Sequence, residues 1–204
     1  MNVVFLDIET GGIEPERPII QVAAVAVDLA EGIEVETFER KLRFDVTHCT
    51  PEALLINHHD ADVWKRDAVD PGLVVQDLKQ FLERHADVEL PSKSGGTYRV
   101  AMVGGHNVVS FDLPRLHVLF KERHAFFPVS WHALDTLCGA AWYFFEKDPR
   151  PVDLKLTTLA AWFGFDVTDA HDALADAWLS ANVARRLLGH NSLEKKVVDI
   201  PDEL

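Results

Sequence analysis

The chain has 204 residues, of which 48% are hydrophobic and 26% charged, which is ordinary for a single globular domain. Its formal charge of −13 argues against a protein that coats long nucleic acids by counterion release. It does not argue against a protein that binds a short end through metal-bridged phosphates. No apolar run is long enough to span a bilayer, and the N-terminus lacks the basic stretch and cleavage site of a secretory signal. We therefore expect a cytoplasmic protein without a membrane partner. Cys49 and Cys138 lie far apart, so we predict free thiols rather than a disulfide or a structural zinc site.

The first predicted element is a buried strand over residues 3–10, an apolar and β-branched run that contains Asp7 and Glu9. Residues two apart in a strand project to the same face, so these two carboxylates lie side by side. Burying two like charges together is costly unless a cation neutralises them. Mg²⁺ and Mn²⁺ prefer oxygen ligands, so this segment is a candidate metal platform.

The rest of the chain alternates strands and helices. The patterns predict strands over residues 18–28 and 33–44 with a turn at Glu31 and Gly32, a helix from Asp70 and Pro71, a polar loop over 91–97, a strand over 100–105, a helix over 111–124, a strand over 131–135, and helices over 137–145, 156–163 and 172–188. Three early strands followed by helices alternating with two more strands indicate an α/β fold with a five-stranded sheet of mixed direction. We expect one domain over residues 1–190 and a tail over 191–204.

Three stretches carry carboxylates that a structural pattern does not need. The first contains Asp7 and Glu9. The second runs from His106 to Asp112, where a buried strand ends and a helix begins. The third runs from His171 to Asp176 and opens the last long helix. Each stretch is a weak signal alone, because Asp112 could be a helix N-cap and His171 a surface histidine.

Together, and in this order, the three stretches resemble the motifs of the DnaQ-like 3′→5′ exonucleases, specifically the DEDDh branch. The resemblance covers roughly residues 1–188 and implies an RNase H-like fold, with an antiparallel meander of three strands followed by two parallel strands. It also implies two divalent ions, Mg²⁺ or Mn²⁺. Asp7 would bridge both ions, Glu9 and Asp176 would complete the site of the ion that activates water, and Asp112 would serve the other ion through water.

The resemblance assigns His171 as the general base, because a histidine has a pKa near neutrality. It places the terminal nucleotide near Thr10, Gly11 and Asn107. The expected product is a nucleoside 5′-monophosphate released from a 3′ end. Gln21 and Ala23 stand where many relatives have an acid and a glycine.

Other side chains have structural interpretations. We read His106 and Asp135 as structural, His58 and His59 as a solvated loop, and Lys147, Arg150 and Lys155 as solvated charges. Residues 142–145 are aromatic and more typical of a core than of a base-stacking platform.

The leading hypothesis is a free-standing 3′→5′ exonuclease for single-stranded 3′ ends, with DNA slightly favoured over RNA. The alternatives are a proofreading subunit bound to a DNA polymerase and an RNA-trimming exoribonuclease of the same family. A scaffold that has lost catalysis is disfavoured because all five functional residues are present. Some relatives are dimers, so a homodimer stays open.

Overall fold

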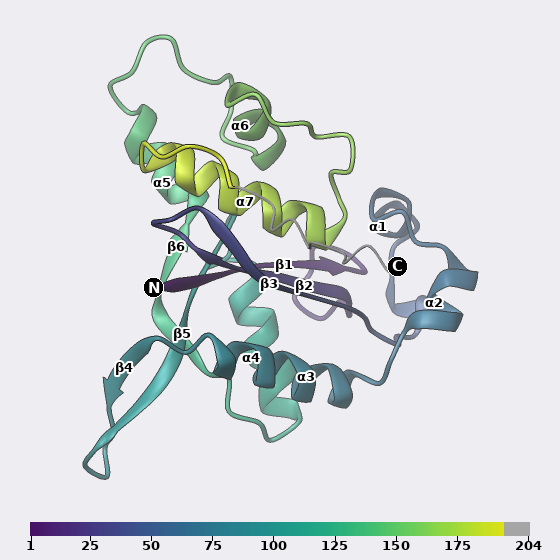
Figure 1. Ribbon diagram of the computed structural model, residues 1–204. Helices are drawn as coiled ribbons and strands as arrows, with labels where there is room; N and C mark the ends of the chain where they lie inside the picture. The colour runs from purple at the N-terminus through teal and green to yellow at the C-terminus, as the bar shows by residue number, and fades with distance from the viewer. Residues whose placement is uncertain (194–204) are drawn as a thin grey trace, which may run out of the picture.

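The computed structural model describes residues 1–193 (Figure 1). In chain order its elements are β1 (Asn2–Thr10), β2 (Ile19–Asp28), β3 (Ile33–Lys41), the 3₁₀ turn η1 (Val46–His48), α1 (Pro51–Ile56), α2 (Ala61–Asp67), α3 (Pro71–Arg84), β4 (Val88–Pro91), β5 (Thr97–Gly105), α4 (Asp112–Glu122), β6 (Val129–Asp135), α5 (Thr136–Phe144), α6 (Leu156–Trp162) and α7 (Ala173–Leu187). Of the predicted tail, residues 194–204 lie outside the described residues. None of the described helices is long and apolar enough to cross a membrane.

The strands form one mixed sheet in the order β3-β2-β1-β5-β4, and β6 also pairs with β5. β1, β2 and β3 are antiparallel neighbours, while β5 runs parallel to β1 and β6 runs parallel to β5. The predicted α/β sheet of mixed direction is confirmed. Its predicted number of five strands is wrong, because β4 adds a short sixth strand antiparallel to the beginning of β5. β4 has only four residues and ends at a proline, so its alternation is too brief to stand out.

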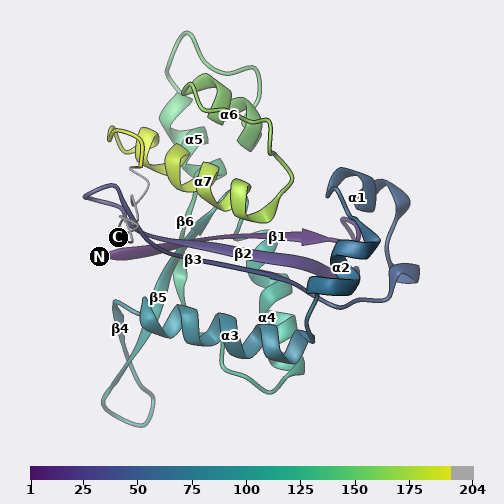
Figure 2. The ribbon, with the colours of Figure 1, turned by 45° about the vertical axis from the view of Figure 1, so that its right-hand side comes forward.

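Helices cover both faces of the sheet (Figures 1 and 2). α3 and α4 pack on one face, and α7, with α5 and α6 beside it, packs on the other. Val4 and Leu6 of β1 join the core on the α3 side, whereas Val3 and Phe5 pack against alanines of α7. Asp7 continues the alternation of Val3 and Phe5 and therefore projects toward α7.

Two short helices beyond the ends of β1 and β2 escape the sequence patterns. α1 begins after Thr50, whose hydroxyl accepts a hydrogen bond from Ala53, and α2 begins after Asp60. Helices of six or seven residues are too short to show a helical period. His59 lies in a loop as predicted, but it is half-buried and its ring packs 4.7 Å from that of Trp64, so the prediction that it is solvated is wrong.

Candidate active site

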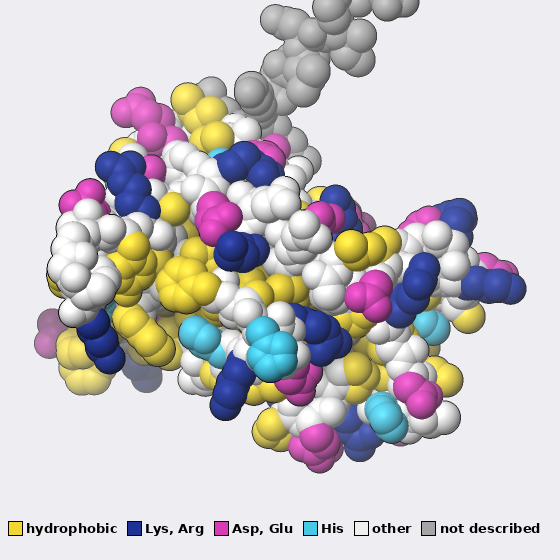
Figure 3. Space-filling model, turned by 90° about the horizontal axis from the view of Figure 1, so that it is seen from below, with side chains coloured by type: hydrophobic (Ala, Val, Ile, Leu, Met, Phe, Trp, Pro, Cys, Tyr) yellow, Lys and Arg dark blue, Asp and Glu magenta, His cyan; other side chains and the backbone are white. Residues whose placement is uncertain are grey.

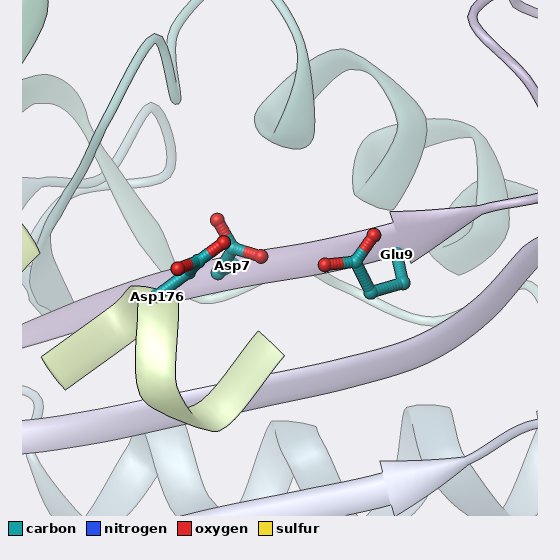
Figure 4. Close-up of side chains that lie close together, drawn as sticks. All are labelled: Asp7, Glu9 and Asp176. Carbon is teal, nitrogen blue, oxygen red and sulfur yellow. The ribbon is translucent and has the colours of Figure 1, made fainter. Parts of the chain in front are cut away.

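Three carboxylates from two elements converge at the centre of the molecule. Asp7 and Glu9 project from β1, and Asp176 reaches them from the first turn of α7 (Figure 4). One oxygen from each of the three groups lies within 4.8 Å of the others. This separation suits ligands that share one hard cation.

The protein holds these acids in an environment that opposes their negative charge. Burial raises the pKa of Asp7 well above its ordinary value, and Asp112, Asp176 and Glu9 raise it further. Burial also raises the pKa of Glu9 to about 8, with Asp176 as the second cause. Asp176 has a raised pKa as well, again mainly through burial. A site of this kind is electrostatically incomplete without a cation.

One oxygen of the cluster has no partner. Asp176 Oδ1 is buried and accepts no hydrogen bond from the described residues, whereas Oδ2 accepts one from the backbone N–H of His171 at 3.2 Å. A buried carboxylate oxygen without a donor is costly unless something else coordinates it. The unpaired oxygen and the neighbouring carboxylates fit a divalent cation.

Asp112 approaches β1 from the start of α4. It is the first residue of α4, it is 3% exposed, and its Oδ1 accepts the backbone N–H of Ile8 at 3.0 Å. Its pKa is raised to about 8, chiefly by burial. The N-cap position of α4 belongs to Phe111, so the alternative reading of Asp112 as an ordinary N-cap is wrong. Asp112 lies beside the three-carboxylate cluster rather than within it.

His171 stands at the entrance to α7 with an exposed side chain and a left-handed backbone, φ +70°. The next residue, Asp172, caps the helix by accepting the N–H groups of Leu174 and Ala175. His171 and Asp172 also line a cavity of about 1100 Å³ that adjoins the site on the β2 side. The imidazole is thus open to solvent, while its own peptide is anchored to Asp176.

The segment after β1 is held by its own hydrogen bonds. Thr10 donates its hydroxyl to Gly12 O and accepts Asn57 Nδ2 at its carbonyl, at 2.7 and 2.9 Å. Gly11 donates to Pro18 and accepts from Thr50, and a Cβ on Gly11 would lie 2.4 Å from Cys49 Sγ. These bonds shape the loop, and the predicted contact of Thr10 and Gly11 with substrate stays a prediction.

Asp135 holds the beginning of the second carboxylate-bearing stretch, which runs from His106 to Asp112. Its carboxylate accepts the N–H groups of Asn107 and Val109 as well as two N–H groups at the start of α5. Asn107 adopts φ +59°, which turns the chain between β5 and α4. His106 Nδ1 lies 2.9 Å from Thr136 Oγ1. The structural readings of Asp135 and His106 agree with these bonds, and the role of Asn107 in substrate binding stays a prediction.

Two residues near the site are absent from the sequence-based candidates. Arg115 donates to the carbonyls of Phe111 and Ile13 and stacks on the Phe111 ring, so it ties α4 to the loop after β1. Gln21 pairs with Glu9 across the ladder and donates to Asp172 at 3.2 Å. Gln21 therefore connects the strand that flanks the acids to the start of α7.

No protein-family model matches this chain, and no curated protein sequence matches it. Solved structures do. A structure of exonuclease I aligns over 93% of the chain with a TM-score of 0.73 and 19% identity. E. coli exonuclease I in complex with a dT13 oligonucleotide aligns over 91% with a TM-score of 0.70 and 20% identity, and its zinc-bound complex with single-stranded DNA over 92% with a TM-score of 0.71 and 19% identity.

The chain has the fold of exonuclease I. The predicted RNase H-like fold is confirmed. The chain spans 40% to 42% of the length of these exonuclease I chains. At this level of identity the likeness concerns the fold, and the functional argument returns to the residues of the site.

Proposed function

We propose that this protein is a metal-dependent 3′→5′ exonuclease that hydrolyses single-stranded nucleic acid and releases nucleoside 5′-monophosphates. The observation that carries the proposal is the carboxylate cluster of Asp7, Glu9 and Asp176, with Asp112 behind it and His171 at its entrance. The fold adds support, since exonuclease I is itself a DnaQ-like exonuclease. Phosphodiester hydrolysis at paired carboxylates is the chemistry that these residues suit.

The donor set favours two divalent ions, Mg²⁺ or Mn²⁺. All four groups are carboxylates, hard ligands that suit these ions, and Asp176 Oδ1 is buried with no donor in the described part of the chain. Asp7 would serve both ions, Glu9 and Asp176 one of them, and Asp112 the other. When bound, the ions supply Lewis acidity at the water nucleophile and at the leaving oxygen.

The protein residues perform the remaining tasks. The exposed imidazole of His171 takes the proton from the attacking water, because neutral histidine is a suitable base near pH 7. Its peptide N–H, bonded to Asp176, keeps that base beside the cluster. Thr10, Gly11 and Asn107 would position the terminal nucleotide.

Single-stranded DNA is the preferred substrate in this proposal. The solved structures with this fold include complexes of E. coli exonuclease I with dT13 and dA16 oligonucleotides. A polymerase partner, an RNA substrate, a homodimer and a cytoplasmic location stay predictions from the sequence.

The test is digestion of end-labelled single-stranded DNA, duplex DNA and RNA by the full chain, with Mg²⁺, Mn²⁺ or EDTA. Wild-type protein should shorten single strands from the 3′ end only when a divalent ion is present. Asp7→Asn should lose activity by roughly 10³-fold or more, equivalent to several kcal/mol of transition-state stabilisation. The matched control is Asp62→Asn, an exposed acid on α2 that should leave the rate unchanged.

Circular dichroism must show that Asp7→Asn is folded. Undiminished activity in folded Asp7→Asn, or full activity in EDTA, contradicts the proposal.

A further inference from the structure

A second concave surface lies at the far end of α4 from the carboxylates. It is a groove of about 600 Å³ between the C-terminal half of α4, the loop that follows, and the beginnings of β5 and β6. We call it the aromatic groove. The lining residues that matter here are Tyr98, His117, Phe120, Lys121, Phe126 and Trp131.

Large rings are exposed there in fixed orientations. Trp131 is 82% exposed and stacks on His117, with ring centroids 5.6 Å apart and planes 15° apart. Phe126 is 57% exposed and meets Tyr98 edge to face at 6.1 Å. Exposed aromatic rings held by neighbours offer flat faces to a ligand with flat faces of its own.

The charge of the groove differs from that of the whole chain. Although the chain has a formal charge of −13, no aspartate or glutamate among the described residues lines the groove, and exposed Lys121 does. Figure 3 views this side of the molecule, where hydrophobic side chains, histidines and basic residues lie together with acidic ones. A polyanion such as a nucleic acid is therefore repelled less at the aromatic groove than the net charge of the chain implies.

We propose that the aromatic groove binds bases of the single strand whose 3′ end lies at the carboxylate site, and this inference rests on the proposed function. Bases stack on aromatic side chains without regard to sequence, and a nearby cation favours the backbone. Aromatic rings are also enriched at protein interfaces, but Lys121 and the lack of acids among the described lining residues favour a polyanion over a protein surface.

Helix α4 sets the length of strand that is needed. Asp112 at the site and Phe120 at the groove are eight residues apart on one helix, which corresponds to about 12 Å at about 1.5 Å per residue. A stacked strand advances about 3.4 Å per nucleotide, so about four nucleotides are the minimum that reaches the groove. Shorter substrates should use the carboxylate site alone.

The test measures binding by fluorescence anisotropy, with 5′-labelled oligonucleotides of 3 and 15 nucleotides, as oligo-dT and oligo-U. The protein is the full chain carrying Asp7→Asn, so that nothing is cut. Adding Trp131→Ala should weaken binding of the 15-mers about tenfold, the loss of one base–ring stack, and leave the 3-mers unchanged. Trp142→Ala is the matched control, because Trp142 on α5 is 83% exposed and lies outside the groove.

Equal affinities of the Trp131→Ala and Trp142→Ala proteins for the 15-mers overturn the inference. So does a change in sedimentation of Trp131→Ala alone without a change in oligonucleotide binding, which assigns the groove to a second copy of the chain. Loss of binding to only one of the two polymers supports the groove and shows which polymer it binds. If the wild-type chain cuts no substrate while the affinity still depends on Trp131, the groove is supported and the proposed function fails.

Discussion

The two ends of α7 both bury charge, and they treat it in opposite ways. At the C-terminal end Arg185 is 5% exposed, and its guanidinium donates to the backbone carbonyls of Leu29, Ala30 and Asn191. At the N-terminal end Asp176 faces other carboxylates, and one of its oxygens has no donor among residues 1–193. Backbone carbonyls therefore compensate the charge of Arg185, whereas the charge of Asp176 lies among other negative charges.

The difference separates a structural charge from a functional one. A buried cation surrounded by carbonyls stabilises the folded chain only with its partners present, and Arg185 has three. Buried carboxylates with raised pKa values instead lower the stability of the ion-free protein and gain affinity for a cation. Perturbing each end should therefore have effects of opposite sign.

The largest effect is expected from pH in the ion-free protein. Glu9 has a pKa of about 8 in the folded state against an ordinary value of 4.5, so between these values the folded state holds more protons than the unfolded state. Stability consequently falls as pH rises from about 4.5 to about 8, by roughly 5 kcal/mol for this group alone. Urea denaturation in EDTA at pH 5, 7 and 9 measures it.

Two controls sharpen this prediction. Mg²⁺ or Mn²⁺ should restore stability above pH 7, because binding to the folded state alone is stabilising. Glu9→Gln should reduce the pH dependence, leaving the part due to the other three acids, and raise the stability at pH 8 in EDTA. A pH-independent stability in the wild-type protein would refute the electrostatic account of the site.

The second effect is a loss of stability when the C-terminal end of α7 is changed. Arg185→Ala should lower the free energy of unfolding by about 3 kcal/mol, because buried carbonyls lose their donor. The matched control is Arg186→Ala, whose half-buried guanidinium lies 5.8 Å from the Phe163 ring and should cost less than about 1 kcal/mol. Urea titrations measure both, and digestion at low temperature should show normal cleavage by folded Arg185→Ala. Equal destabilisation by the two variants contradicts the comparison.

The sequence predicts one side of this contrast, the carboxylate cluster at the N-terminal end of α7, and not the other. Alternation in residues 3–10 predicts that Asp7 and Glu9 share a face, and motif order predicts that Asp112 and Asp176 join them. The structure brings Asp176 within 4.8 Å of the pair, and it bonds Asp112 to the backbone of Ile8, near enough to raise the pKa of Asp7. Periodicity and motifs suffice because these residues lie on long, regular elements.

The supporting residues could not be predicted in this way. Asn57 holds Thr10 across 47 positions, and Arg115 holds Ile13 across 102. Both bonds end on backbone carbonyls, which every residue possesses, so no residue type marks the partner. The short elements α1, α2 and β4 were missed for a related reason, since four to seven residues complete too little of a period.

The smallest effect concerns Arg115, which links the two halves of the site. Its guanidinium joins the helix of Asp112 to the carbonyl of Ile13, and its charge lowers the pKa of Asp112 against the larger effect of burial. Arg115→Lys keeps the charge but loses the planar fork that reaches two carbonyls. We expect kcat/KM for single strands to fall about tenfold, mainly through KM, since a misplaced loop weakens positioning.

In Arg115→Ala, kcat/KM should fall further. The pH profile of kcat should shift to higher pH, because Asp112 loses a neighbouring cation. Arg123→Ala, an exposed arginine just after α4, is the matched control and should change neither parameter. If Arg115→Lys matches wild type in KM while Arg115→Ala does not, the charge alone matters. The hydrogen bonds to the loop are then dispensable, and the site is held together by electrostatics rather than by geometry.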